Sequence, residues 1–391
     1  MANLFQSIKQ FFSQKEPIPV GMYSYLTPPD AENQYRLHLR VEKNGSGILV
    51  INASTVLHLN QTAVEYAYYI IKGTPTDEVV QHVARRYDAD QGQIRQDFEA
   101  FQEQIETLIH TPDLDPVTYL EIERQEPYTD LSAPYRLDCA LTYRVGVGSK
   151  QEDAPVDRVD RELTTKEWKT ILRKAYNAGI PHILFTGGEP TLREDLPELL
   201  QTAEDLGLVT GLLSDGLKLS DKAYLDALLT SGLDHLMMIF DPGNEKDWQV
   251  LEVVLPEDLF TTVHLTLKNG TDLHPVIERL AKLGANAISL SAVEPEMVEQ
   301  LQSLRDDAAI HQLELIWDMP VPYSGNNPVS LELENAEDQE VPEGAGKAWL
   351  YVEPDGDVLP AQGLYEQVLG NMLTDNWEKI WSAENDAQPE L

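Results

Sequence analysis

The most constraining feature of this sequence is a regular alternation of apolar, strand-like runs and amphipathic, helix-like stretches after Pro134. The strand-like runs are Arg136–Thr142, His182–Phe185, Val209–Ser214, His235–Phe240, Thr262–Leu267, Ala287–Ser291 and Glu314–Trp317. The helix-like stretches are Thr165–Asn177, Asp195–Leu206, Asp221–Thr230, Asp247–Val254, Leu273–Leu283 and Glu294–Ala309. This alternation predicts an α/β domain with a parallel sheet, either open or closed into a barrel. In both cases ligands are expected at the carboxyl ends of the strands.

The part of the chain before this region follows a different pattern. Two extended stretches, Tyr35–Val41 and Gly47–Asn52, flank the turn signal Asn44-Gly45. Three amphipathic helices are expected after them, over 61–71, from about Thr76 onward, and over 90–109. A hairpin followed by three small helices is a winged-helix-like unit, so a separate domain is expected at 31–112.

Residues 1–30 predict an amphipathic helix followed by a linker. The apolar side chains of the helix share one face: Leu4, Phe5, Ile8, Phe11 and Phe12. That face would dock on the protein's own body, on a second subunit or on a membrane surface. An irregular linker is then predicted by four prolines, Pro17, Pro19, Pro28 and Pro29.

Charge and hydropathy exclude several classes of function. The 391 residues include 66 acids and 29 bases, which give a formal net charge of −37. Such a field repels nucleic acid and anionic membranes. No apolar run approaches the length of a membrane-spanning helix, and the first residues lack the apolar core of a signal peptide, which predicts a cytoplasmic protein. The acids either solvate the surface or attract cationic peptides and basic partner proteins.

The single cysteine, Cys139, limits metal and redox chemistry. It lies inside an apolar, strand-like run. One cysteine can form neither an internal disulfide nor a multi-cysteine metal site. A buried, inert thiol is favoured over a nucleophile at such a position.

The strongest chemical signal directly follows the second strand, where the sequence reads Phe185-Thr186-Gly187-Gly188-Glu189-Pro190-Thr191-Leu192. Two consecutive glycines permit unusual backbone angles and the close approach of a ligand. The glutamate can accept hydrogen bonds from a cationic amine. The alternative is a tight strand-to-helix turn in which the glutamate is a capping acid, and spacing alone favours that turn.

Residues 134–216 resemble radical S-adenosylmethionine (SAM) enzymes of the peptide-maturing kind, and a weaker resemblance extends to residue 323. The matching segments are Leu141-Thr142-Tyr143-Arg144, Glu162–Trp168, Gly187–Leu192 with Asp195-Leu196, and Ser214-Asp215-Gly216, where the family usually has Thr-Asn-Gly. The resemblance implies a partial (β/α)6 TIM-type barrel at 134–323. It also implies a SAM site at the two strand ends, with the cofactor-binding residues Gly187, Gly188, Glu189, Pro190, Ser214, Asp215 and Gly216.

One part of the family pattern is missing from this chain. After the first strand the family has three cysteines, spaced CxxxCxxC, that bind three irons of a 4Fe–4S cluster. These positions fall on Val145, Ser149 and Glu152. Because such clusters need soft thiolate ligands, the resemblance implies a cofactor whose ligands are absent. We therefore predict no catalytic residue and no metal ligand.

The first domain is similar to the small peptide chaperone of pyrroloquinoline quinone biosynthesis. The similarity rests on Ile48–Asn52, Val56–Ala63 and Lys72–Thr76. It implies a peptide-recognition domain whose exposed strand edge takes up a leader peptide as an added strand. We expect that edge at Gly47–Asn52. The alternative is a domain that only packs on its neighbour.

The last segment, 346–391, resembles the SPASM extension that holds auxiliary clusters in the same enzymes. Ala348–Pro360 predicts a hairpin with a turn at Asp355-Gly356. Ala361 stands where the family usually has a cysteine, so the extension is expected to be degenerate and purely structural. An acidic linker at 324–345 would join it to the barrel, and a second linker at 113–133 would join the barrel to the first domain.

Three functional hypotheses remain. The leading one is a radical-SAM-like pseudoenzyme of a peptide-modification pathway that binds a peptide or a basic partner protein, such as an active paralogue. The second is a SAM-binding enzyme with different chemistry. Its barrel mouth would be lined by residues that are each expected to be satisfied strand-end groups: Asp138, Tyr143, Arg144, His264 and Asp318. The third is a radical enzyme whose cluster is held by unusual ligands or by a partner's cysteines.

Overall fold

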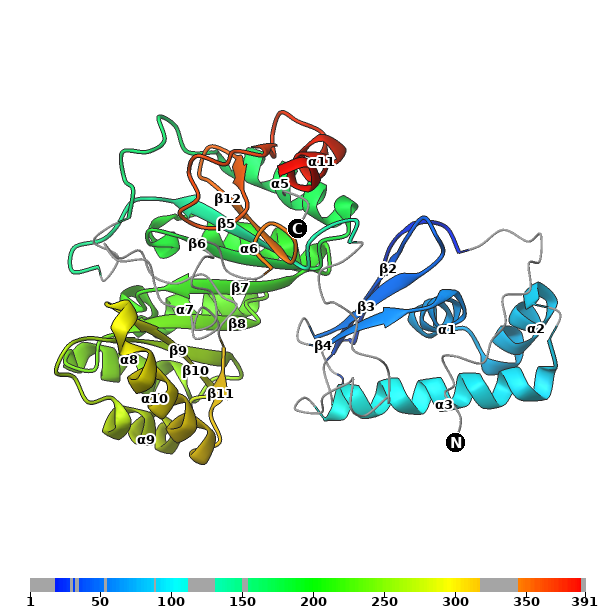
Figure 1. The fold of residues 1–391 in the computed structure, drawn as a ribbon, viewed down its shortest axis with the longest axis horizontal. Helices are drawn as coiled ribbons and strands as arrows, with labels where there is room; N and C mark the ends of the chain where they lie inside the picture. Colours follow the sequence, from blue (N-terminus) through cyan, green and yellow to red (C-terminus); the bar gives the residue numbers. More distant parts are fainter. Residues whose placement is uncertain are drawn as a thin grey trace. The chain divides into compact units, whose positions relative to one another are not determined.

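The computed structural model describes residues 18–28, 31, 35–52, 55–87, 89–111, 131–149, 154–316 and 344–387. Several predictions concern residues outside this set: the N-terminal helix, the linkers 113–130 and 324–343, the cluster position Glu152, Trp317 and Asp318. Contacts divide the chain into two units, 1–132 with 176–181 and 133–175 with 182–391. Each unit is described by itself (Figure 1).

The first unit contains a four-stranded antiparallel sheet of β1 (Gly21–Leu26), β2 (Arg36–Val41), β3 (Gly47–Ile51) and β4 (Thr55–Leu59), in that spatial order. Strands β2 and β3 lie where the sequence predicted them. Strand β1 occupies a stretch that was predicted to be an irregular linker. That prediction was wrong because the prolines flank the strand on both sides and do not interrupt it.

The expectation that Gly47–Asn52 is an open edge is also wrong. Strand β3 pairs with β2 on one side and with β4 on the other, so it has no free hydrogen-bonding side. The reason is a fourth strand, β4, which follows directly and which the sequence reading had not recognised as a strand. The two edge strands of this sheet are therefore β1 and β4.

Three helices cover one face of this sheet: α1 (Gln61–Ile71), α2 (Thr76–Tyr87) and α3 (Gln91–His110). The Asn60 side chain caps α1 by accepting from the Ala63 amide at 3.0 Å. Alternate strand residues point toward the helices, and together they form one core whose largest members include Leu37, Leu39, Leu57, Phe98 and Phe101. The hairpin and the three predicted helices are thus present, with two additional strands.

The second unit is built on a ten-stranded sheet with the order β11-β10-β9-β8-β7-β6-β5-β12-β13-β14. Its strands are β5 (Arg136–Thr142), β6 (His182–Gly187), β7 (Val209–Ser214), β8 (His235–Phe240), β9 (Phe260–Leu267), β10 (Ala287–Ala292), β11 (Glu314–Leu315), β12 (Trp349–Val352), β13 (Asp357–Leu359) and β14 (Gly370–Asn371). Strands β5 to β11 pair in parallel, each beside the next along the chain. The predicted α/β fold with a mostly parallel sheet is confirmed.

Helices connect these strands as the alternation predicted. They are α5 (Thr165–Ala178), α6 (Leu196–Asp205), α7 (Lys222–Thr230), α8 (Glu245–Val254), α9 (His274–Leu283), α10 (Val298–Ile310) and α11 (Trp377–Ala387), with short 3-10 turns η1 (Pro190–Leu192), η2 (Leu217–Ser220) and η3 (Pro295–Met297). Each of the inner helices buries one apolar stripe; α5, for example, buries Trp168, Ile171, Leu172 and Ala175. Among the helices that the structure describes, none has the length and apolar character needed to cross a bilayer.

The C-terminal hairpin joins the main sheet. Strand β12 pairs antiparallel with β13 across the turn at Asp355-Gly356, and it also pairs in parallel with β5, with Trp349 opposite Arg136 and Val352 opposite Cys139. The sequence predicted the hairpin but not this second pairing. As a result, residues that follow β12 lie beside the carboxyl end of β5, where the family places its cluster loop.

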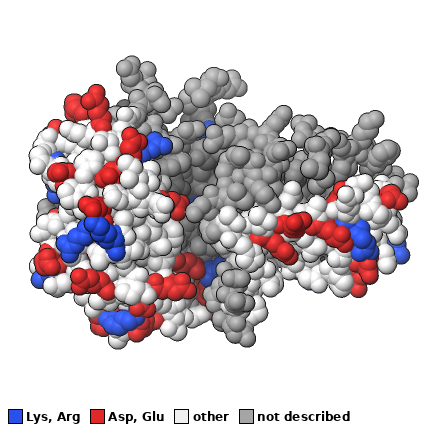
Figure 2. Space-filling model, turned by 90° about the horizontal axis from the view of Figure 1, so that it is seen from below, with Lys and Arg blue, Asp and Glu red and all other residues white. Residues whose placement is uncertain are grey.

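Acidic side chains are distributed over the surface. In the face drawn in Figure 2 they lie in many separate places, with lysine and arginine side chains next to some of them. Several of the acids are paired, as in the exposed ion pair between Lys222 and Glu257 at 2.8 Å. This distribution favours the reading in which the acids solvate the surface.

Candidate functional site

The turn after β6 is shaped by the backbone that follows β5. Gly187 has a φ of +119°, and a Cβ atom there would lie 2.2 Å from the Thr142 carbonyl oxygen. A Cβ atom at Gly188 would lie 2.3 Å from the carbonyl oxygen of Arg144. The Gly188 amide donates to Thr142 at 2.7 Å, and the Glu189 amide donates to Arg144 at 2.8 Å. Both glycines are therefore required by the close contact between two neighbouring strand ends.

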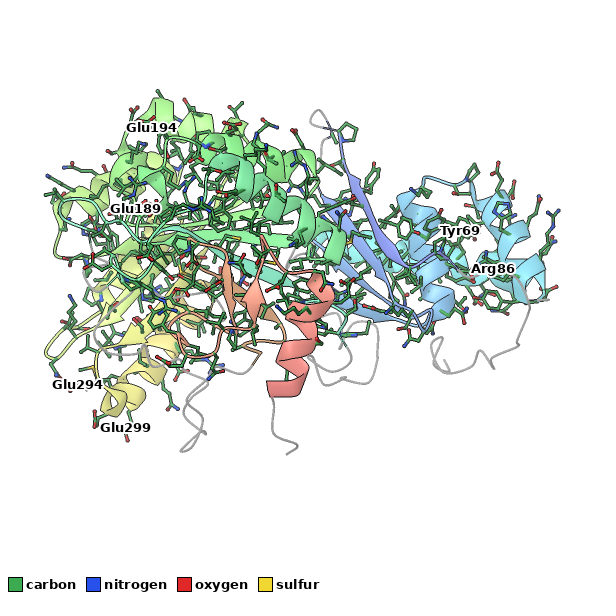
Figure 3. All side chains as sticks on the ribbon, turned by 90° about the horizontal axis from the view of Figure 1, so that it is seen from above. Tyr69, Arg86, Glu189, Glu194, Glu294 and Glu299 are labelled. Carbon is green, nitrogen blue, oxygen red and sulfur yellow. The ribbon has the colours of Figure 1, made fainter. Side chains whose placement is uncertain are left out.

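Glu189 is buried in this turn, with 2% of its surface exposed. Its Oε1 accepts hydrogen bonds from the Thr191 amide at 3.0 Å, the Thr191 hydroxyl at 2.6 Å and the Ser214 hydroxyl at 2.9 Å. Its Oε2 accepts from the Asp215 amide at 2.7 Å. Glu189, labelled in Figure 3, therefore caps η1 and also connects the end of β6 to the end of β7 through Ser214 and Asp215.

The remaining predicted site residues lie around this carboxylate. Pro190 begins η1, a position where its missing amide hydrogen costs nothing. The Gly216 amide donates to Ser214 Oγ at 3.0 Å, and the φ of Gly216 is +78°. The Asp215 side chain accepts from the Leu217 amide at 3.0 Å. The structure thus brings all seven predicted residues together at the carboxyl ends of β6 and β7.

Burial, followed by the nearby charge of Asp215, raises the pKa of Glu189 to about 7, even though the hydrogen bonds from Thr191 and Asp215 act in the opposite direction. The carboxylate sits in a low-dielectric environment and is held there by internal donors. An incoming ammonium group, such as that of SAM, needs an accessible acceptor on Glu189. Three donors already bind Oε1 and one binds Oε2, so the acceptor capacity that is left for an ammonium group lies on Oε2, on a side chain that is almost completely buried.

The segment after β5, where the family places its cluster, is buried at its two ends, Tyr143 and Ser149, and partly or fully exposed between them. Tyr143 is buried, and its hydroxyl donates to Glu353 Oε1 at 2.8 Å. The Ser149 amide donates to the Gly146 carbonyl at 3.1 Å, which closes a β-turn with Gly148 at a φ of +82°. Val147 at the tip of this turn is fully exposed.

Glu353 anchors both sides of this segment. It is 1% exposed, and besides Tyr143 it binds Arg158, whose Nε donates to Oε1 and whose Nη2 donates to Oε2 at 2.7 Å. The Arg158 guanidinium also lies 4.1 Å from the centroid of the Tyr365 ring. The hydrogen bonds from Arg158 to this carboxylate raise the pKa of the guanidinium still further, so Arg158 stays charged.

The three positions that correspond to cluster cysteines do not suit an iron–sulfur cluster. Val145 packs against an apolar group that contains Ala140, Ala154, Tyr351 and Leu359. Ser149 is buried in its turn, and Glu152 lies outside the described residues. Cys139 is buried within β5, and burial together with the charge of Asp138 raises the pKa of its thiol. These positions offer no thiol, and the one thiol of the chain is buried within β5, so the residues present do not fit a 4Fe–4S cluster.

The polar residues that were considered for the barrel mouth have partners of their own. Asp138 forms a buried ion pair with Arg136 at 2.7 Å. Arg144 donates to the Thr142 hydroxyl at 3.1 Å. His264 contacts the hydroxyls of Ser289 at 3.1 Å and Ser291 at 3.0 Å. As predicted, these residues are satisfied within the fold, while Asp318 lies outside the described residues.

Sequence reasoning missed the residues that fill the cluster position. Arg158 and Glu353 are separated by 195 residues, and although Glu353 lies in the predicted hairpin, no local pattern pointed to its pairing with Arg158. Glu353, Asp355 and Asp357 also stand close enough to be considered as metal ligands. However, Glu353 is occupied by Arg158 and Tyr143, and Asp357 Oδ1 accepts from the Asn371 side chain at 2.8 Å. Glu353 and Asp357 therefore stabilise the hairpin and its contacts through these hydrogen bonds.

Comparison with known proteins agrees with the second unit. Residues 139–258 match the family model of the radical SAM superfamily. The matched region runs from β5 through α8 and so contains the Gly-Gly-Glu turn and the end of β7. The presence of this domain is consistent with the partial barrel that the resemblance implied.

The fold as a whole is similar to that of SuiB from Streptococcus suis. The structure of SuiB bound to S-adenosylmethionine aligns with a TM-score of 0.56 and 14% identity, over 92% of this chain and 88% of SuiB. SuiB bound to the precursor peptide SuiA aligns with the same TM-score and identity, over 88% of this chain and 86% of SuiB. At this identity the comparison establishes the fold, and it includes both units of the chain.

Proposed function

We propose that this chain is a radical-SAM-like binding protein that performs no radical chemistry of its own and whose ligand is a peptide or a partner polypeptide. The observation that supports the proposal is the packing after β5, where Val145 stands at the first expected cysteine position and packs with apolar side chains, while the neighbouring Tyr143 binds the Arg158–Glu353 pair. A protein without the cluster cannot pass an electron to SAM. What the fold retains is its framework and its first unit.

The direct test of the missing chemistry is a measurement of iron and acid-labile sulfide per chain after strictly anaerobic reconstitution. We expect no stoichiometric cluster, and no 5′-deoxyadenosine when SAM and dithionite are added. A stable cluster together with SAM cleavage would contradict the proposal and would point to the alternative, an enzyme with unusual cluster ligands.

The peptide part of the proposal rests on β4, which is an edge strand of this sheet among the strands that the structure describes. In the antiparallel ladder, the Glu42 amide donates to Ser46 and the Asn52 amide donates to Arg36, so alternate β3 residues face β2. The intervening residues of β3 face β4 and bind Thr55, Leu57 and Leu59 through the register of this pair. Val56 therefore directs its backbone N–H and C=O groups away from β3, on the side where an added strand would pair.

Two features make β4 a better template than β1. The side chains of Thr55, Leu57 and Leu59 are buried, so the backbone of β4 is fixed before a ligand arrives. Strand β1 is less anchored, since Leu26 at its end is 42% exposed. SuiB, which has been crystallised with a precursor peptide, supports a polypeptide as the ligand class.

Matched proline substitutions test this assignment. Val56→Pro removes an outward N–H from β4, and Ser24→Pro removes an outward N–H from β1, while the inner ladder bonds stay intact in both. A peptide selected from a displayed random library should bind the Val56→Pro variant at least about 10-fold more weakly than the unmodified protein. Ser24→Pro should bind it normally. Equal affinity for the Val56→Pro variant would remove β4 as the peptide site.

A further inference from the structure

We infer that the carboxyl end of β5 has been rebuilt as a structural lock in which Glu353 of the C-terminal extension holds both arms of the loop that a cluster would otherwise fix. This inference rests on the proposed absence of a cluster and goes beyond it. It states what replaces the metal and why the replacement excludes a cluster even when thiolate ligands are supplied.

The first component of the lock is a shared carboxylate. Tyr143 stands where the loop leaves β5, and Arg158 stands on the returning arm, yet both donate to Glu353. Glu353 is almost completely buried, and these donors satisfy its two oxygens. One side chain of the C-terminal hairpin therefore binds both arms of the loop.

The second component is a set of contacts on the returning arm. The Leu163 amide donates to the Pro354 carbonyl at 2.7 Å, one residue after Glu353. Arg158 Nη2 donates to the Tyr365 carbonyl at 3.3 Å, and its guanidinium stacks on the Tyr365 ring. The arm from Arg158 to Leu163 thus lies along the extension over several residues.

The third component is apolar filling between the two arms. The side chains of Val145 and Val159 pack with Ala154, Tyr351 and Leu359 into one cluster. A four-iron cluster needs a cavity and soft ligands at this place. Here the space contains side chains in contact with one another, and the nearest polar groups already have partners in the Glu353 network.

The lock predicts that the buried pair matters far more than an exposed pair in the same arm. Arg158→Ala leaves the Glu353 charge buried without its main donor, so the unfolding equilibrium constant in denaturant should rise on the order of 100-fold. Arg161→Ala is the matched control, because Arg161 pairs with Glu167 at the surface and is itself 60% exposed. That substitution should change the constant by no more than about 5-fold.

Hydrogen exchange adds a readout specific to the lock. Arg158→Ala should expose the amides of 143–149 and 154–163 to faster exchange and leave those of β8 and β9 unchanged. Equal effects of the Arg158 and Arg161 substitutions on stability and exchange would overturn the inference.

A second experiment asks whether thiolates alone are sufficient. The triple variant Val145→Cys, Ser149→Cys and Glu152→Cys is reconstituted anaerobically beside the unmodified protein, with iron and sulfide measured in both. We expect no stoichiometric cluster in either. A cluster in the unmodified protein would refute the proposed function. A stoichiometric cluster in the triple variant alone would refute the lock and leave the proposed function intact.

Discussion

Two neighbouring segments at the carboxyl edge of the sheet differ in how well they match the family pattern, yet both are held by similar internal hydrogen bonds. The turn after β6 retains the Gly-Gly-Glu-Pro pattern of SAM-binding proteins, whereas the segment after β5 has none of the three cysteines that normally accompany it. In the folded protein both are occupied by internal contacts. Glu189 binds Thr191, Ser214 and Asp215, and Glu353 binds Tyr143 and Arg158.

The glycines of the turn after β6 have a structural explanation that does not involve a ligand. The two glycines after β6 are needed because the backbone of residues 142–144 passes within contact distance of them. A sequence pattern that matches a ligand-binding family can therefore persist for packing reasons alone. Whether SAM can bind at this turn depends on the accessibility of Glu189 and not on the presence of the motif.

The largest effect is expected from a methyl group added to the β6 turn. In Gly188→Ala the new Cβ would lie 2.3 Å from the Arg144 carbonyl oxygen and 2.6 Å from that of Tyr143. Relief requires a backbone shift in both turns, so the free energy of unfolding should fall by at least about 3 kcal/mol. Gly146→Ala is the control in the β5 segment, where the nearest atom would be 3.9 Å away, and its effect should stay within about 1 kcal/mol. Chemical denaturation measures both, and a similar small loss in the two variants would break the comparison.

A smaller loss is expected when the carboxylate of the β6 turn is removed. Glu189→Ala leaves the amides of Thr191 and Asp215 buried without an acceptor, which should lower the free energy of unfolding by about 3 kcal/mol or slightly less. Glu194→Ala, at an exposed glutamate five residues later, should change it by less than about 0.5 kcal/mol. If Glu189→Ala kept full stability and instead lost measurable SAM affinity, the turn would be a ligand site and the comparison would have to be reversed.

A largely buried histidine pair at the amino ends of β6 and β8 predicts that the stability of this unit depends on pH. His235 Nε2 lies 2.7 Å from His182 Nε2, and burial, together with the charge of Arg136, lowers the pKa of His235 to about 4. The unfolded state takes up this proton near the ordinary pKa of about 6.5, so stability is complete above that pH and falls as the pH drops toward 4.

This histidine accounts for up to about 1.4 kcal/mol per pH unit in that window. In His235→Gln, the curve of unfolding free energy against pH should be flatter between pH 6.5 and 4 by up to that amount, as thermal or urea unfolding at a series of pH values would show. Parallel curves for the two proteins would mean that the buried pair does not set the acid limit of this unit.

The sequence was sufficient for the repetitive part of the fold and for the Gly-Gly-Glu turn. Strands β5 to β11 follow from apolar runs of strand length. The seven site residues, Glu189 among them, were indicated by the resemblance to radical SAM enzymes, whereas spacing alone favoured a capping turn. Local signals of this kind survive in a single sequence because each element carries its own period and its own turn residues.

The strand pairings and the ion pair that the sequence did not predict depend on residues that are distant from one another in the chain. Strand β1 was hidden by flanking prolines, and β4 changed Gly47–Asn52 from an edge into an inner strand. The Arg158–Glu353 pair has no local signature, because each residue would be an ordinary surface charge without the other. The same is true of β12, whose apolar run gives no indication that it will pair with β5.

The pairing of β12 with β5 also sets the order in which the second unit can be completed during synthesis. Until Trp349–Val352 has left the ribosome, one side of β5 presents unpaired amide and carbonyl groups, and Tyr143 lacks a partner that lies 210 residues further on. An open strand edge of this kind recruits other strands, including those of neighbouring nascent chains. Strand β12 therefore covers the outer side of β5, and a chain that stops short of Trp349 is expected to expose that strand edge.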